Sequence, residues 1–562
     1  MPGVFVAMRN SFWVTAAGWP RAWVQWAVLG VVLGVGLLAG LDAPEIGLME
    51  ARNFVAAREI HASGSWLLPT MNGELRLAKP PLPTWLVAAV MHLTGSTTNL
   101  GLLRLPSALG AMLLVLFSWA LARRLMPAAD QGRTAWLSAV VLASSLLLLL
   151  TGRDGNGWDV YCYCWLLGAL AAMVRGLQHP GRAWAWFGAA GLLLGLSILS
   201  KGPVALYGML LPFVLAYAWR GDRAALRRQW PGLLVMSLLG LGVGGAWPLY
   251  VLSQHLREAS QVAQAESSSW ASRHVQPVWY YLRFPAFMGV WALAALAALV
   301  RPYAAPRLRP YAPYALLLVW MAATLVLLSL VPEKKERYLL PVLPPLAMLT
   351  AGLLRYWVSR PVLPRPDAWL LRGWVGVLGG AALALPLVLR LASLPGFALH
   401  SPGYWAAALL SLAAAALAGW LWRQQQLALA APVLSLLLVL LVSGVLMPAY
   451  PQWQRRRDDA GLRPLARVVQ QRPALRRKPV YSLAEMQIKW IWYAGRVVPR
   501  WAPAAEAHPL RLLPVLVYAP ARGAAPFPPG WAQRYRILTV DSFDLSHRFA
   551  DGRWYITEIN RR

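Results

Sequence analysis

Long apolar runs constrain this chain more than any other feature. Many are about twenty residues long, the length an α-helix needs to cross the hydrocarbon core of a bilayer. Hydrophobic residues make up 58% of the 562 positions and charged residues only 13%, whereas a soluble protein carries about 25% charged residues. The sequence therefore predicts an α-helical polytopic membrane protein. The thirteen predicted spans are 22–41, 104–122, 134–151, 158–176, 183–199, 203–219, 231–252, 284–300, 313–331, 338–356, 370–391, 404–422 and 428–448.

Basic residues are concentrated in alternate loops between these spans. The chain has 53 Lys and Arg against 22 Asp and Glu, a formal net charge of +31. Nucleic-acid binding would need a basic patch on a soluble surface, whereas short Arg-rich loops follow the positive-inside pattern. We therefore expect no nucleic-acid partner, a cytoplasmic N-terminus and, after an odd number of spans, periplasmic residues beyond 449. The basic loops carry Arg123, Arg124, Arg133, Arg175, Arg182, Arg220, Arg223, Arg227, Arg228, Arg301, Arg307, Arg309, Arg355, Arg360, Arg365 and Arg423.

Two segments differ from the spans. Pro83 to Leu93 is apolar but too short to cross a bilayer, so we interpret it as an interfacial or re-entrant helix in a first periplasmic loop, residues 42–99. Residues 450–562 are polar and Pro-rich, and their strand-like runs predict a small periplasmic α/β domain. The expected domains are thus 1–449, transmembrane with an amphipathic first loop, and 450–562. The strand-like runs are 479–482, 514–518, 535–540 and 554–559.

Ionisable residues at the ends of membrane spans are functional candidates, because charge is costly there. Lys79 precedes Pro80-Pro81, and Lys201 precedes Gly202-Pro203. The prolines restrict the backbone, so each ammonium is held at a rigid turn where it suits a lipid phosphate. Snorkelling of the lysine to the headgroups is the alternative for Lys79.

Three more candidates lie at the predicted periplasmic ends. Asp159 begins an otherwise apolar helix, where it either caps the helix or acts on a substrate. His274 lies in a long loop with Glu266 and a run of aromatic residues that suits sugar rings or the membrane interface. Arg337 ends the charged run Pro332-Glu333-Lys334-Lys335-Glu336-Arg337, whose cations suit a phosphate or diphosphate.

The sequence gives little support for a metal or another cofactor. His274 and Glu266 are a conceivable pair, but they lack the tight spacing of metal ligands. Cys162 and Cys164 are two residues apart in an apolar helix, so they do not face each other. We expect neither a disulfide nor a metal site there, and no cofactor is assigned.

Several short motifs, taken in order, resemble those of the GT-C class of integral-membrane glycosyltransferases. The chain is most similar to the superfamily of protein O-mannosyltransferases and aminoarabinose (lipid A) transferases, glycosyltransferase families 39 and 83. The resemblance covers about residues 42–345, and more loosely the C-terminal domain. The matching stretches are Glu50-Ala51-Arg52-Asn53, Ala56-Ala57-Arg58-Glu59, Asn72-Gly73-Glu74, Lys79-Pro80-Pro81-Leu82, Arg104-Leu105-Pro106-Ser107, Ser200-Lys201-Gly202-Pro203, His274-Val275-Gln276-Pro277, Tyr280-Tyr281, and Arg337-Tyr338 with Pro341 and Pro344.

The resemblance implies an inverting glycosyltransferase of the bacterial inner membrane with a periplasmic active site. Its donor would be a sugar on undecaprenyl phosphate, and its acceptor lipid A, another envelope glycan or a protein. An acceptor oxygen attacks the anomeric carbon while a carboxylate takes its proton, and cations stabilise the leaving phosphate. The implied lipid-phosphate or substrate ligands are Arg52, Arg58, Lys79, Lys201, His274 and Arg337.

The chain departs from the family pattern at the expected base. The family's first loop begins with an Asp-Glu pair, and Met49 occupies the aspartate position. The candidate carboxylates are then Glu50, which matches the family's glutamate, Asp42 and Asp159. The residue before Lys79, often Glu in the aminoarabinose transferases, is Ala78, which argues against a metal site there. A second hypothesis follows from Met49: a non-catalytic polyprenyl-lipid-binding or lipid-transport protein.

Overall fold

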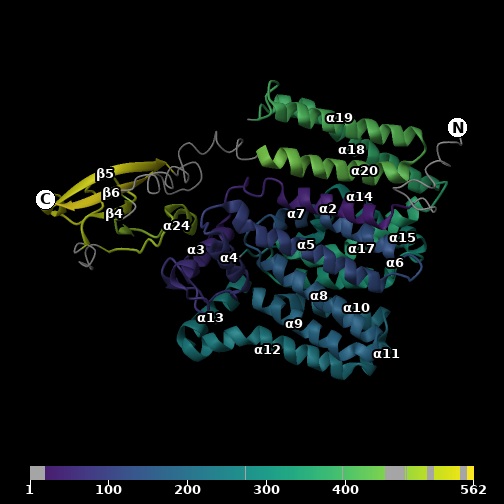
Figure 1. Cartoon of the computed structure of the whole chain (residues 1–562), viewed down its shortest axis with the longest axis horizontal. Helices are drawn as coiled ribbons and strands as arrows, with labels where there is room; N and C mark the ends of the chain where they lie inside the picture. The colour runs from purple at the N-terminus through teal and green to yellow at the C-terminus, as the bar shows by residue number, and fades with distance from the viewer. Residues whose placement is uncertain are drawn as a thin grey trace. The chain divides into compact units, whose positions relative to one another are not determined.

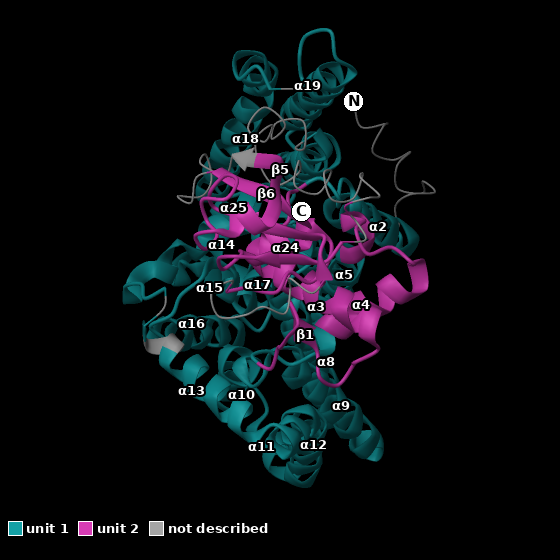
Figure 2. Ribbon diagram, turned by 90° about the vertical axis from the view of Figure 1, so that its left-hand side faces the viewer, with its two compact units in different colours: residues 1–43, 78–83, 104–449 teal, residues 44–77, 84–103, 450–562 magenta. Residues whose placement is uncertain are grey.

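The computed structural model describes residues 19–272, 274–394, 396–449, 475, 478–502, 512–544 and 553–562. These residues form two compact units, shown in teal and magenta in Figure 2. Unit 1 contains residues 1–43, 78–83 and 104–449, and unit 2 contains residues 44–77, 84–103 and 450–562. Residues 1–18, at the N-terminus that the sequence predicts to be cytoplasmic, lie outside the described residues.

Unit 1 is a bundle of apolar helices (Figure 1). Within the described residues, nine helices are long and apolar enough to cross a membrane, or ten if the bent pair α6–α7 is one span. Its elements are α2 (Ala22–Leu38), α5 (Leu100–Leu125), α6 (Gln131–Ala143), α7 (Leu146–Gly152), α8 (Trp158–Gln178), η1 (Pro180–Arg182), α9 (Ala183–Lys201), η2 (Leu206–Leu210), α10 (Leu211–Arg220), α11 (Arg223–Arg228), α12 (Trp230–Gln254), α13 (Leu256–Ser272), η3 (Val278–Trp291), α14 (Ala292–Leu299), α15 (Arg301–Leu308), α16 (Tyr314–Leu330), η4 (Glu336–Val342), α17 (Leu343–Val358), α18 (Arg365–Leu391), α19 (Pro402–Arg423), α20 (Leu427–Leu441), η5 (Val442–Leu446) and η6 (Met447–Ala449).

The helical class predicted from the apolar runs is confirmed, and every predicted span coincides with a helix or a pair of helices. The count of thirteen exceeds the nine or ten that meet a full span's length. Three predicted spans account for the difference: α2 and α16 have 17 residues each, and the third is α10 with a π-helical turn before it. Breaks at Gly and Pro shorten these helices without changing their apolar character.

Glycines allow the helices beside the candidate site to pack closely. Helix α9 contacts both α8 and α12, and the three are neighbours in Figure 1. A Cβ atom on Gly195 of α9 would lie 2.5 Å from Val243 Cβ, and one on Gly244 of α12 would lie 2.5 Å from Ile198 Cβ. Small residues at such spacings are typical of close helix pairs in membranes. This packing fixes the end of α9 at which Lys201 lies.

Unit 2 combines two helices of the first loop with the C-terminal sheet. All four predicted strands are present, in the order β3-β4-β6-β5, with β3 parallel to β4 and the other pairs antiparallel. The elements are α3 (Leu48–Ser63), β1 (Thr70–Met71), β2 (Glu74–Leu75), α4 (Leu82–Thr94), β3 (Val480–Ser482), α24 (Ile488–Ala494), β4 (Val515–Ala519), α25 (Trp531–Arg534), β5 (Tyr535–Asp544) and β6 (Arg553–Arg561).

Strand β4 is buried on both faces because its alternate side chains enter two different cores. Val515 and Val517 pack with Trp501 and Phe527, as the period of two in a strand requires. Leu516 and Tyr518 join a core that also contains residues of α3, α4 and α24. The first-loop helices therefore share a hydrophobic core with the sheet. The division at residue 449 remains a prediction about independent domains.

Candidate functional site

Three elements of unit 1 meet around the carboxylate of Asp159. This residue lies in the first turn of α8, which follows Gly157 at a φ of 67°. Lys201 ends α9 and donates a hydrogen bond to Asp159 Oδ1. Arg337, at the start of η4, places Nε 3.1 Å from Asp159 Oδ2. The carboxylate is thus held between two cations, and action of Asp159 on a substrate stays a prediction.

Tyr338 forms an aromatic wall beside these charges. The Lys201 ammonium lies 4.4 Å from the centre of its ring, within the range of a cation–π contact. The ring thus helps to orient Lys201.

The short segment before η3, residues 274–277, reaches the site through an antiparallel pairing. Val275 bridges Glu333, Gln276 N–H donates to Pro332 O at 3.2 Å, and Lys334 N–H donates to His274 O at 3.2 Å. His274 has a φ of 51°, in the left-handed region that non-glycine residues seldom occupy. This pairing holds His274 at the charged run that precedes η4.

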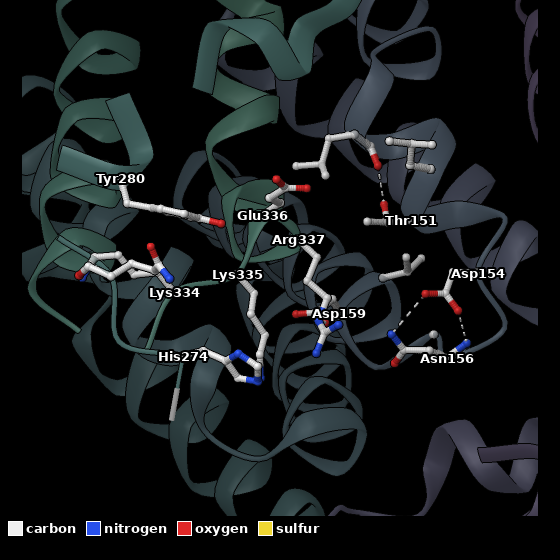
Figure 3. A pocket seen from close by; sticks show the side chains of 15 residues that line it. Thr151, Asp154, Asn156, Asp159, His274, Tyr280, Lys334, Lys335, Glu336 and Arg337 are labelled. Atoms are coloured by element: carbon white, nitrogen blue, oxygen red, sulfur yellow. Dashed lines mark hydrogen bonds and ion pairs between the residues drawn. The ribbon is translucent and has the colours of Figure 1, made fainter. Parts of the chain in front are cut away.

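A cavity of about 420 Å³ opens between these segments. Figure 3 shows Arg337 directed toward Asp159, and Asp154 directed toward Asn156 on the neighbouring turn. The cavity combines carboxylates, cations, an amide, an imidazole and an aromatic ring, which suits a polar ligand with an anionic group. Its lining residues are Leu147, Leu150, Thr151, Asp154, Asn156, Gly157, Asp159, Val160, His274, Gln276, Tyr280, Lys334, Lys335, Glu336 and Arg337.

The two lysines of the lining are held differently. Lys335 pairs with Glu333. The Lys334 ammonium instead donates to the backbone carbonyls of Val331 at 2.7 Å and Gln276 at 3.1 Å, and burial lowers its pKa. Lys334 therefore braces the pairing of the two segments, while Lys335 keeps an ammonium at the cavity beside a carboxylate.

Asp42 is exposed and lies just beyond a firmly held helix end. Arg153 donates to Gly36 O at 3.0 Å and also bonds Ala39 O and Gly40 O. Arg104 donates to Leu41 O at 2.9 Å. Cations suit the carbonyl end of a helix, so these arginines fix the end of α2. Asp42 itself is not among the residues that line the cavity, although Asp154, the chain neighbour of Arg153, is.

The first-loop candidates in unit 2 have structural partners. Glu50 is buried and accepts a hydrogen bond from Gly47 N–H at 2.9 Å, at the start of α3. The Arg58 guanidinium donates to Trp492 O at 3.0 Å and Ile491 O at 3.1 Å, and burial lowers its pKa to about 10. Arg52 is exposed and contacts Met49 Sδ at 3.8 Å. Of the three, Arg52 alone presents its charged group to solvent.

Lys79 forms an ion pair with Glu266 of α13 at 2.8 Å, within unit 1. Both side chains are about one-third exposed, at 29% and 35%. The pair links the Lys-Pro-Pro turn to the helix that leads to His274. The ammonium predicted to bind a lipid phosphate is therefore accessible, and a carboxylate accompanies it.

The sequence identified Asp159, Lys201, His274 and Arg337 as four separate candidates. The structure brings Lys201 and Arg337 to the carboxylate of Asp159. Sequence reasoning missed Asn156 and the cavity roles of Thr151 and Gln276. Asn156 carried one usable signal, a polar residue between two glycines at a span end. Within the described residues, no group of three or more His, Cys, Asp and Glu is arranged to hold a metal ion.

Comparison with known proteins finds similar membrane glycosyltransferases, the class suggested by the sequence motifs. Residues 78–243 match the family described as dolichyl-phosphate-mannose-protein mannosyltransferase, and residues 270–393 match the Alg9-like mannosyltransferase family. The undecaprenyl phosphate-alpha-4-amino-4-deoxy-L-arabinose arabinosyl transferase 1 of Sodalis glossinidius is 28% identical over 66% of this chain and 65% of its own length. The corresponding transferase of Pseudomonas paraeruginosa is 29% identical over 75% of this chain and 76% of its own.

The fold is also that of a solved relative. The crystal structure of ArnT from Cupriavidus metallidurans, bound to undecaprenyl phosphate, matches with a TM-score of 0.69 at 20% identity. The match covers 95% of this chain and 98% of that protein. The chain is thus similar in sequence to membrane glycosyltransferases of the protein mannosyltransferase and aminoarabinose transferase superfamily, and it has the fold of ArnT.

Proposed function

We propose that this chain transfers a sugar from undecaprenyl phosphate to a cell-envelope acceptor, on the periplasmic side of the bacterial inner membrane. The observation that carries the proposal is the cavity at Asp159, where two cations hold a buried carboxylate at the meeting of α8, α9 and η4. Relatives named as undecaprenyl phosphate-aminoarabinose transferases support the donor class. The acceptor is lipid A, another glycan or a protein.

The cations of this region suit the charge that develops on the leaving phosphate. As the acceptor oxygen bonds to the anomeric carbon, the bond to the phosphate oxygen breaks and its electron pair stays on the phosphate. Preorganised cations stabilise such charge without reorganising at the moment of reaction. Lys335 and Arg337 line the cavity, and Lys79 offers a further accessible ammonium.

Asp42 is the carboxylate best suited to take the acceptor's proton, inverting the anomeric centre. Glu50 is buried and its Oε2 accepts the Gly47 N–H. Both oxygens of Asp159 are already engaged by cations, Oδ1 by Lys201 and Oδ2 by Arg337. Asp42 is exposed and directly follows the end of α2 that Arg153 and Arg104 hold. Asp159 is then a positioning residue that orders Lys201 and Arg337.

The test is transfer by purified protein with an undecaprenyl-phosphate sugar and candidate acceptors, measured as release of free undecaprenyl phosphate. Asp42→Asn should lower single-turnover transfer by about 10²–10⁴-fold with lipid binding retained, and Glu50→Gln should leave transfer near the parent's. Full turnover by Asp42→Asn would place the base elsewhere.

A second function, binding or moving the lipid without cleaving it, is favoured by Met49 at the family's aspartate position. A protein of that kind would bind the donor and release no undecaprenyl phosphate with any acceptor. Gain of transfer in Met49→Asp, from a parent that transfers nothing, would identify this chain as the non-catalytic form.

The periplasmic placement has its own test. The Arg-rich alternate loops and the odd number of predicted spans favour a C-terminus outside the cytoplasm. A reporter that is active only in the periplasm, fused after Arg562, should be active. Activity of a cytoplasmic reporter alone would overturn the thirteen-span topology.

A further inference from the structure

Two histidines of unit 2, neither of which lines the cavity described above, converge at one point. His61 lies in the last turn of α3 and His92 in the last turn of α4. Their Nδ1 atoms are 2.6 Å apart, and the ring planes are inclined at 77°. Two imidazole nitrogens at this distance either share a proton in a hydrogen bond or direct their lone pairs at a common cation.

The backbone around the pair is firmly placed. Ile60 and Met91, the residues before the two histidines, are both buried in the core shared by α3 and α4. Near the other end of the same helices, Thr84 donates to Asn53 Oδ1 at 2.7 Å. This bond and the histidine contact each join residues 31 positions apart, so the helices run in the same direction and in register. The fold thus brings the two rings together.

The surroundings favour a cation at this point. Both histidines lie at helix C-termini, where unsatisfied carbonyls carry partial negative charge. The ring of Trp66 lies 5.9 Å from that of His92 and limits its movement on one side. A cation held between the rings would thus be stabilised by two helix dipoles and by two nitrogen lone pairs.

We propose that His61 and His92 form a site for a divalent cation of the zinc class, which joins the C-terminal ends of α3 and α4. Neutral imidazole nitrogen is a common ligand of such ions. Tetrahedral zinc with Zn–N distances of about 2.0–2.1 Å holds two nitrogens about 3.3 Å apart, so the rings need to separate by about 0.7 Å. His92 is exposed and His61 partly exposed, which leaves room for this movement and for water at the other positions. The role is structural and independent of the proposed sugar transfer.

The experiment uses the full-length protein in detergent, purified without a polyhistidine tag and stripped with a chelator. Zn²⁺ is titrated by calorimetry, and thermal unfolding is followed with and without Zn²⁺. The parent should bind one Zn²⁺ and unfold at a higher temperature with it. His61→Ala and His92→Ala should each weaken binding by on the order of tenfold or more, as loss of a ligand should cost at least what loss of its supporting shell does.

Two variants keep the outcome clear. His400→Ala removes an exposed histidine of unit 1 and should leave Zn²⁺ binding unchanged. His61→Gln keeps a polar side chain at the same position in case the alanine variant folds poorly, and it should also lose the metal. A parent without saturable Zn²⁺ binding, or folded variants that bind Zn²⁺ as the parent does, would overturn the proposal and leave a hydrogen-bonded imidazole pair.

Discussion

Two of the buried aspartates of unit 1, Asp367 and Asp159, lie in different surroundings. Asp367, in the first turn of α18, is fully buried. It accepts hydrogen bonds from the Tyr303 hydroxyl, from Arg307 Nε at 3.0 Å and Nη2 at 3.2 Å, and from Trp357 Nε1 at 3.1 Å. Asp159 is also buried, but it lines a cavity. A carboxylate whose oxygens are surrounded by hydrogen-bond donors has a structural role, whereas one that lines a cavity can also contact a ligand.

A second pair supports a structural role for the region around Asp367. Arg355, in the last turn of α17, places Nε 2.9 Å and 3.0 Å from the two oxygens of Asp130. Thr134 donates to the same carboxylate at 2.6 Å. Buried pairs of this kind are costly to break, because removing one partner leaves an uncompensated charge. These arginines, which mark alternate loops in the sequence, fasten helix ends to one another.

The largest expected effect is on folding, from Asp367→Ala. The substitution leaves Arg307 without its bidentate partner in a buried place, which should cost about 3–5 kcal/mol. The measurement is thermal unfolding of the detergent-solubilised protein, beside Asp159→Ala as the matched variant. Asp159→Ala should lose less stability, since water in the cavity can solvate Arg337. Equal losses would remove the distinction between the two sites.

For transferase activity, unlike stability, we expect the substitution at Asp159 to have the large effect. Asp159→Asn keeps the size of the side chain and removes the charge that orders Lys201 and Arg337. We expect transfer to fall by about 10²–10³-fold, as when one preorganised electrostatic group is removed, with little change in unfolding temperature. Single-turnover transfer at saturating donor measures it. Asp159→Glu should recover part of the rate, which a purely structural role would not predict.

The sequence predicted the fold well because apolar length and strand alternation are local properties. The helices and all four C-terminal strands follow from them. Lys201 and Arg337 were likewise found locally, from a lysine before Gly-Pro and a charged run before a proline-broken helix. Their pairing with Asp159 could not be predicted in this way. Asp159 lies 42 residues from Lys201 in the chain, and only the packing of α8 against α9 brings them together.

Glu50 shows a second limit of prediction from local sequence, because its partners were not foreseen. Its family position suggested proton transfer, but its bond to Gly47 N–H at the start of α3 depends on where the helix begins. Arg58 is similar, since its carbonyl partners Ile491 and Trp492 are more than 430 residues away. Local sequence cannot distinguish a charge held by the backbone from one offered to a ligand.

The ion pair of Lys79 with Glu266 is partly exposed, unlike the buried pairs of Asp159 and Asp367. If Lys79 binds the lipid phosphate, Lys79→Ala should weaken undecaprenyl phosphate binding by about 1.5–3 kcal/mol, the worth of a hydrogen bond to a charged group. Glu266→Gln should strengthen binding slightly, by up to about 1 kcal/mol, because an exposed competing ion pair is worth that much. The measurement is lipid affinity of both single variants and the double variant. A Glu266→Gln effect that persists in Lys79→Ala would separate Glu266 from the lysine.

The smallest effect is expected in unit 2, where Glu558 pairs with Lys478 at 2.7 Å and both side chains are partly exposed. Burial alone would raise the pKa of Glu558, but hydrogen bonds from Lys478 and Asn560 outweigh it and lower the pKa below its ordinary 4.5. A carboxylate with a lowered folded pKa stabilises the fold above the unfolded value, and this contribution is lost as pH falls through the folded value. Glu558→Gln should therefore cost no more than about 1 kcal/mol at pH 7.

Unfolding of parent and variant measured between pH 7 and pH 3 should converge in acid, because the parent's carboxylate becomes protonated. A gap that widens as the pH falls would show that Glu558 acts through its hydrogen bonds as a neutral acid, and the partly exposed pair would then resemble neither of the buried aspartates.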